Sequence, residues 1–392
     1  MTATVRAGYV VRAPVGEEWS MPSLMPPPVR EDAALISLRR EVRSFLAEQV
    51  EAGAFAPTVD SWLSGWDVEF TRALAQRGWL GMTVPVEHGG HGRTFLERFV
   101  VTEELLAAGA PVAAHWIADR QVAPNLLRFG SDALKGEYLP RIVAGEVFFA
   151  IGMSEPDSGS DLASVRTRAE RVDGGWRVRG TKLWTSGAHL ADAFIALVRT
   201  SPQSEDRHGG LSQLLVLLDS PGVQVRPVLS ANGTHHFNEV HLDGVHVPDE
   251  HVVGEIGAGW HQVTSELSFE RSGPERFLST YQLAKSLVGS LDPAEAGRIS
   301  ARLAGLHQMS LSVAAALQNS ERPDVPAALV KVLGTTLEGD IAELADLDTP
   351  AGASGGVAAL TRRAVQQRPG FTLRGGTNEV LRGVIARGLG MR

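Results

Sequence analysis

The sequence predicts an α+β protein in which two helical blocks flank a central block of strands. Three observations lead to this prediction. Apolar residues recur at helical spacing through residues 33–148, beginning at Leu35. After Phe148 the pattern changes to short strand-like runs separated by turn residues. After Gly259 the helical spacing returns, and no regular repeat runs through the chain. Segregated blocks of this kind do not predict the alternating order of a βαβ fold.

Four segments result from these changes of pattern. Residues 1–32 are rich in proline and predict an extended arm. Residues 33–148 form the first helical domain, residues 149–258 the middle β domain, and residues 259–392 the C-terminal helical domain. In the last of these, one apolar stripe consists of Ile299, Leu303, Leu306, Met309, Val313 and Leu317.

The strongest strand signal is the segment RAERVDGGWRVRG, which alternates on both sides of Asp173-Gly174. An Asp-Gly pair between alternating runs predicts a tight β-hairpin. At the other end of the chain, TNEVLRGVIARGLG predicts a short capped helix.

Composition excludes several classes of function. The chain of 392 residues has no cysteine, so disulfides, thiolate metal sites and cysteine nucleophiles are excluded. A net charge of -8 argues against a nucleic-acid partner, which requires a concentrated basic face. No apolar run approaches the roughly 18 residues that a membrane-spanning helix needs. We therefore expect a cytoplasmic protein with no nucleic-acid or membrane partner.

The stretch FFAIGMSEPDSGSDLAS places a polar loop directly after an apolar strand. Its serines and the free backbone N–H groups around Gly159 are suited to an anion or to the polar edge of a ring. A connection between domains is the alternative interpretation of this loop.

A second segment favours the ligand interpretation. In GTKLWTSGAHLADAF, Trp184 stands beside Thr185 and Ser186 at the end of a predicted strand. The indole offers a flat apolar face and the hydroxyls offer hydrogen-bond donors at its rim. Together the two segments suit a planar heteroaromatic cofactor, although a lone tryptophan is more often a core residue.

These segments resemble the paired flavin-binding signatures of the acyl-CoA dehydrogenase family. The tail GGTNEVLRGVIARGLG resembles the terminal motif of that family, and PDEHVVGEIGAGW resembles its transition from β domain to C-terminal helices. The resemblance implies a helical N-terminal domain, a middle β-barrel or sandwich domain, a C-terminal four-helix bundle, and FAD between them. It also implies α,β-dehydrogenation of an acyl thioester, with hydride passing to flavin N5.

The resemblance further implies roles for individual residues. Trp184 is expected to pack on the isoalloxazine, and Ser186 stands where the family usually has a threonine near flavin N5. Ser160 is expected to contact both the flavin and the CoA portion of the substrate, and Arg271 and Gly376 are further substrate contacts. The complete cofactor set is Met153, Ser154, Gly159, Ser160, Trp184, Thr185, Ser186, Thr377 and Glu379.

The α-proton base departs from the common family pattern. Many members carry it directly before the Gly-Thr of the terminal motif, where this chain has Gly375. The isovaleryl-CoA dehydrogenase type places the base in a Glu-Arg pair on a neighbouring helix, which Glu270-Arg271 resembles. We therefore expect Glu270 to be the base. A surface acid paired with Arg271 is the alternative for this residue.

Glu275 is the competing carboxylate. Positions five apart on a continuous helix differ by roughly 140°, so Glu270 and Glu275 cannot both face one pocket. Ser272-Gly273-Pro274-Glu275 resembles a capping box with proline in the first turn, which predicts that the helix restarts at Ser272. In that interpretation Glu275 serves the helix end.

Two further departures concern FAD. The family's Arg-x-Thr-Phe-Gly segment has no match in KSLVGSLDPAEAGRIS, and LDTPAGASGGV is at best a remnant of its Gln-x-x-Gly-Gly-x-Gly region. The adenine half of FAD is then held differently, held by a partner subunit, or not held. The resemblance implies a homo-oligomer, but because the FAD-contact segments are missing, a hetero-oligomer is also possible. It further implies an electron-transfer flavoprotein as the electron acceptor.

Two other functions remain open from the sequence. A flavin monooxygenase on the same scaffold needs no α-proton base, so Gly375 is compatible with it. A non-catalytic subunit that completes the FAD site of a partner is compatible with the missing segments. No metal site is expected, because the histidines of NGTHHFNEVHLDGVHVPDEH are scattered and have no ordered carboxylate ligands.

Overall fold

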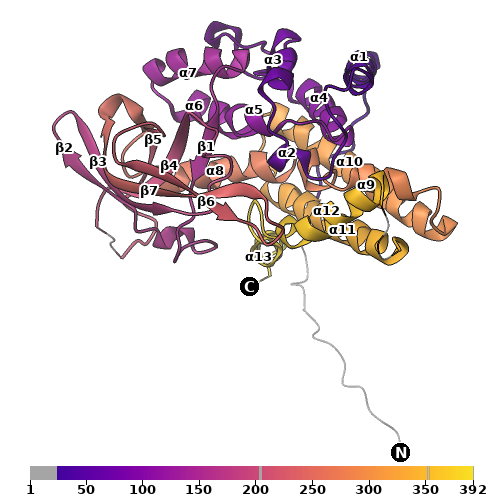
Figure 1. Cartoon of the computed structure of the whole chain (residues 1–392). Coiled ribbons are helices and arrows are strands. Elements are labelled where there is room, and N and C mark those ends of the chain that lie inside the picture. The colour runs from indigo at the N-terminus through magenta and orange to yellow at the C-terminus, as the bar shows by residue number, and fades with distance from the viewer. Residues whose placement is uncertain (1–23, 203–204, 351, 353, 392) are drawn as a thin grey trace, which may run out of the picture.

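The computed structural model describes residues 24–202, 205–350, 352 and 354–391, with only the backbone described for residues 266–270. The strands form a layer on one side of the molecule, and the C-terminal helices lie on the other side (Figure 1). The N-terminal helices cover the region between them. The order of helices, strands and helices confirms the predicted α+β class.

The first helical block begins at a side-chain cap. The Asp32 carboxylate accepts a hydrogen bond from the backbone N–H of Leu35 at 2.9 Å, which satisfies a free donor of the first turn. Of the predicted arm, residues 1–23 lie outside the described residues, and residues 24–32 contain no helix or strand. The block consists of α1 (Ala33–Glu51), α2 (Ser61–Ser64), α3 (Val68–Gln76), α4 (Phe95–Ala107), α5 (Ala113–Ile117), the π-helical turn η2 (Ala118–Val122), α6 (Ala123–Phe129) and α7 (Asp132–Ala144).

The strands form one sheet of mixed direction. They are β1 (Phe149–Gly152), β2 (Arg168–Val172), β3 (Gly175–Lys182), β4 (Ala193–Arg199), β5 (Leu211–Leu217), β6 (Val223–Leu229), β7 (His235–Pro248) and β8 (Val252–Val253). Their order is β6-β7-β3-β2-β4-β5-β8, and β1 pairs parallel to β4. The predicted hairpin is confirmed, because Val172 pairs with Gly175 across Asp173-Gly174. Gly174 has a φ of 69°, which glycine adopts without strain.

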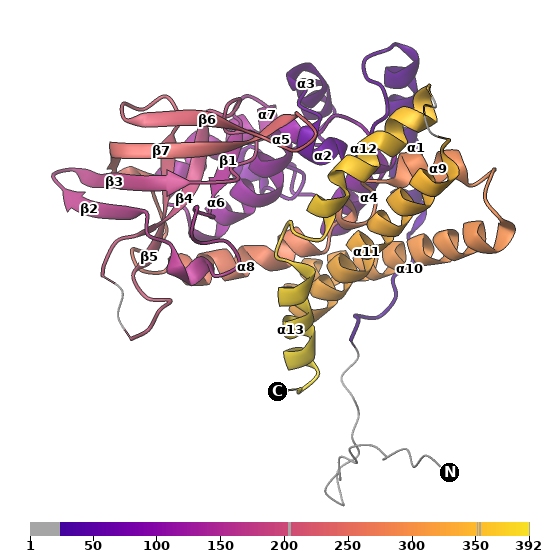
Figure 2. The same cartoon turned by 60° about the horizontal axis from the view of Figure 1, so that its bottom comes forward.

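The second helical block comes after the sheet. It consists of α8 (Gly259–Arg271), the 3-10 turn η5 (Pro274–Arg276), α9 (Tyr281–Leu287), α10 (Pro293–Gln318), α11 (Asp324–Asp348), α12 (Gly356–Phe371) and α13 (Asn378–Gly388). Figure 2 shows α10, α11 and α12 packed alongside one another, with α13 projecting from them. The predicted apolar stripe lies on α10, where Ile299, Leu306 and Val313 are buried.

Two apolar cores join the blocks. One core contains residues of α1, α3 and α4 together with residues of α10, α11 and α12, so the two helical blocks are packed as one body. The other core joins α6 and α7 to β1 and β4. The sheet is thereby fixed to the N-terminal helices. Within the part of the chain that the structure describes, no helix combines the length and apolarity needed to cross a membrane.

Candidate active site

The structure brings the two predicted flavin-binding segments together. The backbone N–H of Leu183 donates to the carbonyl of Ser154 at 2.9 Å, so the 153–160 bend lies directly beside the end of β3. A buried ion pair reinforces this contact. Lys182 Nζ lies 2.8 Å from Glu155 Oε1 and donates to the Met153 carbonyl at 3.2 Å.

The Glu155 carboxylate is the centre of the bend. It accepts hydrogen bonds from the backbone N–H groups of Arg166 at 2.6 Å and Thr167 at 2.9 Å. Burial alone would raise the pKa of Glu155, but the charge of Lys182 and these hydrogen bonds outweigh it and leave that pKa below its usual value. Burial lowers the pKa of Lys182 to about 8, against the opposing effect of Glu155.

The bend presents polar groups at its open side. Ser158 and Glu155 exchange backbone hydrogen bonds at 2.7 and 3.2 Å, and the Ser158 hydroxyl donates to the Asp161 carbonyl. Gly159 and Ser160 are exposed, and Ser154 is half-buried. The closed turn therefore leaves the Ser154 and Ser160 hydroxyls available to a ligand.

Trp184 has an unusual backbone conformation. Its φ is 61°, in the left-handed region that a bulky residue rarely adopts. The side chain is 54% exposed and meets the ring of Phe237 edge-on, with 5.6 Å between centroids. Strained residues of this kind cluster at binding sites, and this one holds an indole face open beside the bend.

Thr185 and Ser186 come directly after the indole. Thr185 is fully buried and exchanges backbone hydrogen bonds with Asn238 of β7 at 3.0 and 3.1 Å. Its hydroxyl Oγ1 has no hydrogen-bond partner in the described part of the chain. Ser186 is half-buried. The open indole of Trp184, the half-buried Ser186 hydroxyl and the orphaned buried Thr185 hydroxyl fit the face and edge of a flavin ring.

The terminal motif lies against the end of α8. Arg271 Nε donates to the Gly375 carbonyl at 3.2 Å, and a Cβ built at Gly376 would lie 3.2 Å from Arg271 Nη2. Gly375 has a φ of 66°, and a Cβ there would lie 2.8 Å from Arg276 Nη2. An acidic side chain at position 375 would strain the backbone and would have to displace the Arg276 guanidinium.

Thr377 and Glu379 begin α13. The Thr377 hydroxyl accepts a hydrogen bond from the Val380 N–H at 3.3 Å, as an N-cap. Glu379 is exposed in the first turn, where its own backbone N–H and the Thr377 hydroxyl lower its pKa. The structure thus gives Thr377 a capping role.

Glu270 is the penultimate residue of α8. Its side chain lies outside the described residues, so only its backbone position is known. That position directly precedes Arg271, whose side chain contacts the Gly375 carbonyl.

The predicted helix restart at Ser272 is wrong. Ser272 is the C-cap of α8, and Pro274–Arg276 form a 3-10 turn without a side-chain cap. Glu275 is 3% exposed, and its carboxylate lies 3.5 Å from Arg120 Nη2 and 3.9 Å from Arg276 Nε. Glu275 therefore serves a buried charge cluster and does not cap a helix.

Sequence reasoning missed a second junction of the three blocks. Arg374 Nη1 donates to both carboxylate oxygens of Asp60 at 2.7 and 2.9 Å, and its guanidinium lies 4.8 Å from the Trp62 ring. Burial lowers the pKa of His236 to about 4, with Asp60 opposing the shift and Arg374 adding to it. Burial raises the pKa of Glu338 to about 7. These residues are far apart in sequence, so no local pattern predicts that they meet. The one available signal was the position of Arg374 directly before the terminal glycines.

One group of three side chains in the described residues has metal-ligand spacing, namely Glu31, Glu103 and His307. Arg39 forms ion pairs with both acids, so their charge is already compensated. None of the five histidines of the β7 region belongs to this group.

Family models match most of the first two blocks. The model of the acyl-CoA dehydrogenase N-terminal domain matches residues 33–146, and that of the middle domain matches residues 150–245. Acyl-CoA dehydrogenase IpdE1 of Mycobacterium tuberculosis is 35% identical over 369 residues, covering 89% of this chain and 95% of its own. Mitochondrial isovaleryl-CoA dehydrogenase of Oryza sativa is 31% identical over 208 residues, covering 52% of this chain and 50% of its own.

Solved structures agree with this fold. The Tcur3481-Tcur3483 steroid ACAD has a TM-score of 0.80 and 30% identity, covering 93% of this chain and 99% of its own. The ChsE4-ChsE5 complex from Mycobacterium tuberculosis has a TM-score of 0.78 and 30% identity, with the same coverage.

The Lys182–Glu155 pair gives a first prediction. Lys182→Met leaves the Glu155 carboxylate buried without its cation, and we expect a loss of about 3–5 kcal/mol in the free energy of unfolding. Arg171→Met removes the exposed pair with Asp249 and is the matched control, with an expected loss below about 1 kcal/mol. Urea unfolding of both variants measures the difference, and equal losses would contradict the buried-pair assignment.

His236 gives a pH prediction. Its pKa is about 4 in the folded chain, against an ordinary value near 6.5, so between these values the unfolded chain binds the extra proton. Stability is therefore lost as pH falls from 6.5 to 4. His236→Gln should flatten this loss by up to about 3 kcal/mol, measured by urea unfolding across that pH range. The exposed His91→Gln variant should retain the wild-type dependence, and an unchanged slope for His236→Gln would refute the assignment.

Proposed function

The chain belongs to the acyl-CoA dehydrogenase family, and from that premise we propose that it catalyses FAD-dependent α,β-dehydrogenation of an acyl thioester. The observation that carries the proposal is the 2.9 Å hydrogen bond between Leu183 and Ser154, which joins the 153–160 bend to Trp184. Bound FAD would supply the electron sink for the hydride that leaves the β-carbon. The carrier is coenzyme A or an acyl carrier protein.

We assign the cofactor contacts to side chains at the contact between the 153–160 bend and the end of β3. Trp184 would pack on the isoalloxazine, and Thr185 and Ser186 would offer hydroxyls to its polar edge. Met153, Ser154, Gly159 and Ser160 would line the bend against the same ring. Thr377 and Glu379 would approach the cofactor from the start of α13. Ser160, Arg271 and Gly376 would also contact the substrate.

Glu270 is the proposed base. Its neighbour Arg271 ties the end of α8 to the Gly375 carbonyl at 3.2 Å, so Glu270 belongs to the helix end nearest the terminal motif. Gly375 offers no proton acceptor, and Arg276 occupies the space beside it. A carboxylate removed from water is a stronger base than one in solution, which suits abstraction of the α-proton. Glu275 is the weaker candidate because two guanidinium groups engage its carboxylate.

The proposed assembly is an oligomer with a second subunit near the FAD site. Apolar side chains are exposed on α11, where Leu333 is 47% and Leu347 81% exposed, and on α13, where Val380 is 41% exposed. Leu333 and Leu347 are fourteen residues apart and share one helix face. The Tcur3481-Tcur3483 steroid ACAD and the ChsE4-ChsE5 complex are each named for two polypeptides, which supports a second polypeptide as an alternative to a second copy. An electron-transfer flavoprotein is the proposed electron acceptor.

The base assignment is tested with Glu270→Gln. We expect this variant to bind acyl-CoA but to reduce its flavin about a hundredfold more slowly or worse, because general-base catalysis contributes at least that much. Anaerobic stopped-flow loss of the flavin band measures the rate. Glu255→Gln, an exposed acid before α8, is the control and should behave as wild type. Normal reduction in Glu270→Gln together with loss in Glu275→Gln would move the base to Glu275, and normal reduction in both would mean that neither carboxylate is the base. A wild-type flavin that no acyl-CoA reduces would favour a monooxygenase.

The assembly is tested with Leu347→Asp. A charge on this exposed apolar face should shift the protein to a smaller species and lower its bound flavin, measured by light scattering and by the visible spectrum. Val86→Asp, at another exposed apolar residue, in the N-terminal block (70% exposed), should change neither. A colourless wild-type chain that turns yellow only with a second polypeptide would instead favour the non-catalytic subunit.

A further inference from the structure

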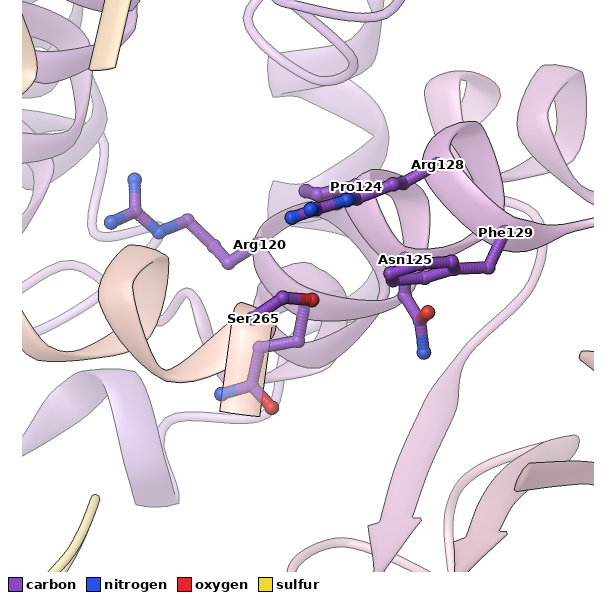
Figure 3. Close-up of a pocket in the computed structure, with 7 residues that line it drawn as sticks. Arg120, Pro124, Asn125, Arg128, Phe129 and Ser265 are labelled. Atoms are coloured by element: carbon purple, nitrogen blue, oxygen red, sulfur yellow. The ribbon is translucent and has the colours of Figure 1, made fainter. Parts of the chain in front are cut away.

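Two cavities in the described part of the chain differ greatly in size. One lies between η2, α6 and α8, where Arg120, Asn125 and Ser265 help to line a volume of about 10 Å³ (Figure 3). That volume is about the minimum that holds one water. The other has a volume of about 340 Å³ and lies between α1, α4, α9 and α10, on the side of the molecule away from the sheet (Figure 2). A volume of this size suits a small molecule, and no residue that lines it belongs to the proposed cofactor set.

Part of the lining of the larger cavity is apolar. The apolar residues come from α4, α10 and the segment before α9, and they are Ala107, Phe277, Leu278, Leu303 and Ala304. Phe277 and Leu278 are buried members of the core that the two helical blocks share. An apolar surface fixed in this way suits a hydrocarbon body.

The rest of the lining is largely charged, and arginines engage its carboxylates. Arg39 forms one ion pair with Glu31, just before α1, and another with Glu104. Its Nη1 also lies 2.8 Å from Glu103 Oε2. Arg43 donates to the two carboxylate oxygens of Glu104 at 2.7 and 3.0 Å. Glu103 and Glu104 are buried, so these charges are part of the helix interface.

The protonation of His307 sets the net charge of this lining. His307 Nδ1 lies 2.6 Å from Glu103 Oε1, and this hydrogen bond raises the pKa of His307 above its ordinary value. Burial and Arg39 oppose the rise, while Glu31 adds to it. The charged and titratable groups that share the cavity with His307 are Glu31, Arg39, Arg43, Glu103, Glu104 and Tyr281. With His307 protonated, three cations face three carboxylates and the lining is neutral, whereas with His307 neutral it carries one net negative charge.

Three groups of the lining have hydrogen-bonding capacity that the described residues do not use. Arg43 binds Glu104 through Nε and Nη2, which leaves Nη1. His307 uses Nδ1, which leaves Nε2, and the Tyr281 hydroxyl makes no hydrogen bond within the described residues. A guanidinium and a protonated imidazole can only donate, and a phenol can donate as well as accept. The unused groups therefore favour an anionic head group over a cationic one.

We propose that this cavity binds a small amphipathic carboxylate. Its head accepts hydrogen bonds from Arg43, Tyr281 and His307, and its hydrocarbon body lies against Phe277 and Leu303. The site is separate from that of the proposed dehydrogenation, and the inference does not depend on that activity. Because a neutral His307 leaves the lining with one net negative charge, binding weakens as pH rises through the pKa of His307.

The test compares three probes of one chain length, namely octanoate, 1-octanol and octylamine. Isothermal titration calorimetry of the purified protein gives their affinities, and we expect octanoate to bind about tenfold more tightly than the other two or better. Tyr281→Phe removes only the hydroxyl and should weaken octanoate binding about two- to tenfold, while Arg43→Met should weaken it about tenfold or more. Arg40→Met, at an exposed arginine of α1 that does not line the cavity, is the matched control and should bind as wild type.

The pH dependence gives a second readout. In the wild type, octanoate affinity should fall about fivefold or more between about pH 6.5 and about pH 8.5, as His307 loses its proton. His307→Gln cannot titrate in this range, so it should bind octanoate weakly at both pH values without that fall.

The other outcomes overturn one proposal or the other. Equal affinities for the three probes, no binding, or a preference for octylamine would overturn the carboxylate site. Octanoate binding that both Tyr281→Phe and Arg43→Met leave unchanged, or that saturating octanoyl-CoA abolishes, would place the probe at the catalytic site instead. Tyr281→Phe retains the pair of Arg43 with Glu104, so it decides the case if Arg43→Met fails to fold. Octanoate binding with the expected variant effects, in a protein whose flavin no acyl-CoA reduces, would support the cavity site and refute the dehydrogenation.

Discussion

A lysine and a glutamate that are both removed from water must stay paired, and Lys182 and Glu155 do so at 2.8 Å. The glutamate belongs to the bend after β1 and the lysine to the end of β3, so their pairing fixes the distance between two chain segments. Trp184 lies two residues beyond that lysine, so the same contact helps to hold its backbone at a φ of 61°. The geometry of the candidate active site therefore depends on this contact.

The remaining walls of the site come from helices fixed by a second set of polar contacts. Arg374 joins the terminal motif to Asp60 of the first block, and Arg271 joins the same motif to the end of α8. Each contact uses an arginine, whose guanidinium can satisfy several acceptors at once. A loop containing two glycines with positive φ would otherwise have many conformations, and these contacts select one.

Periodicity and turn chemistry were enough to predict the blocks, the Asp173-Gly174 hairpin and the α10 stripe, because those signals are local. The proximity of the 153–160 bend to Trp184 was predicted from family motifs and is reproduced by the structure. The buried contact between Arg120 and Glu275 was out of reach, since the two residues lie on separate elements. The helix restart at Ser272 failed for a related reason. A local capping pattern was outweighed by the burial of Glu275 against the distant Arg120 and the neighbouring Arg276.

The π-helical turn η2 determines the direction in which two charged side chains project. A π turn holds one residue more than a regular helix, and each added residue rotates the rest of the helix by about 100°. Asp119 and Arg120 lie within this turn, and α6 continues from it without a break. A single-codon deletion there would restore an ordinary helix and turn the charged pair toward a new direction while leaving the core topology intact. The length of this turn therefore sets the direction of two charged side chains independently of the packing around it.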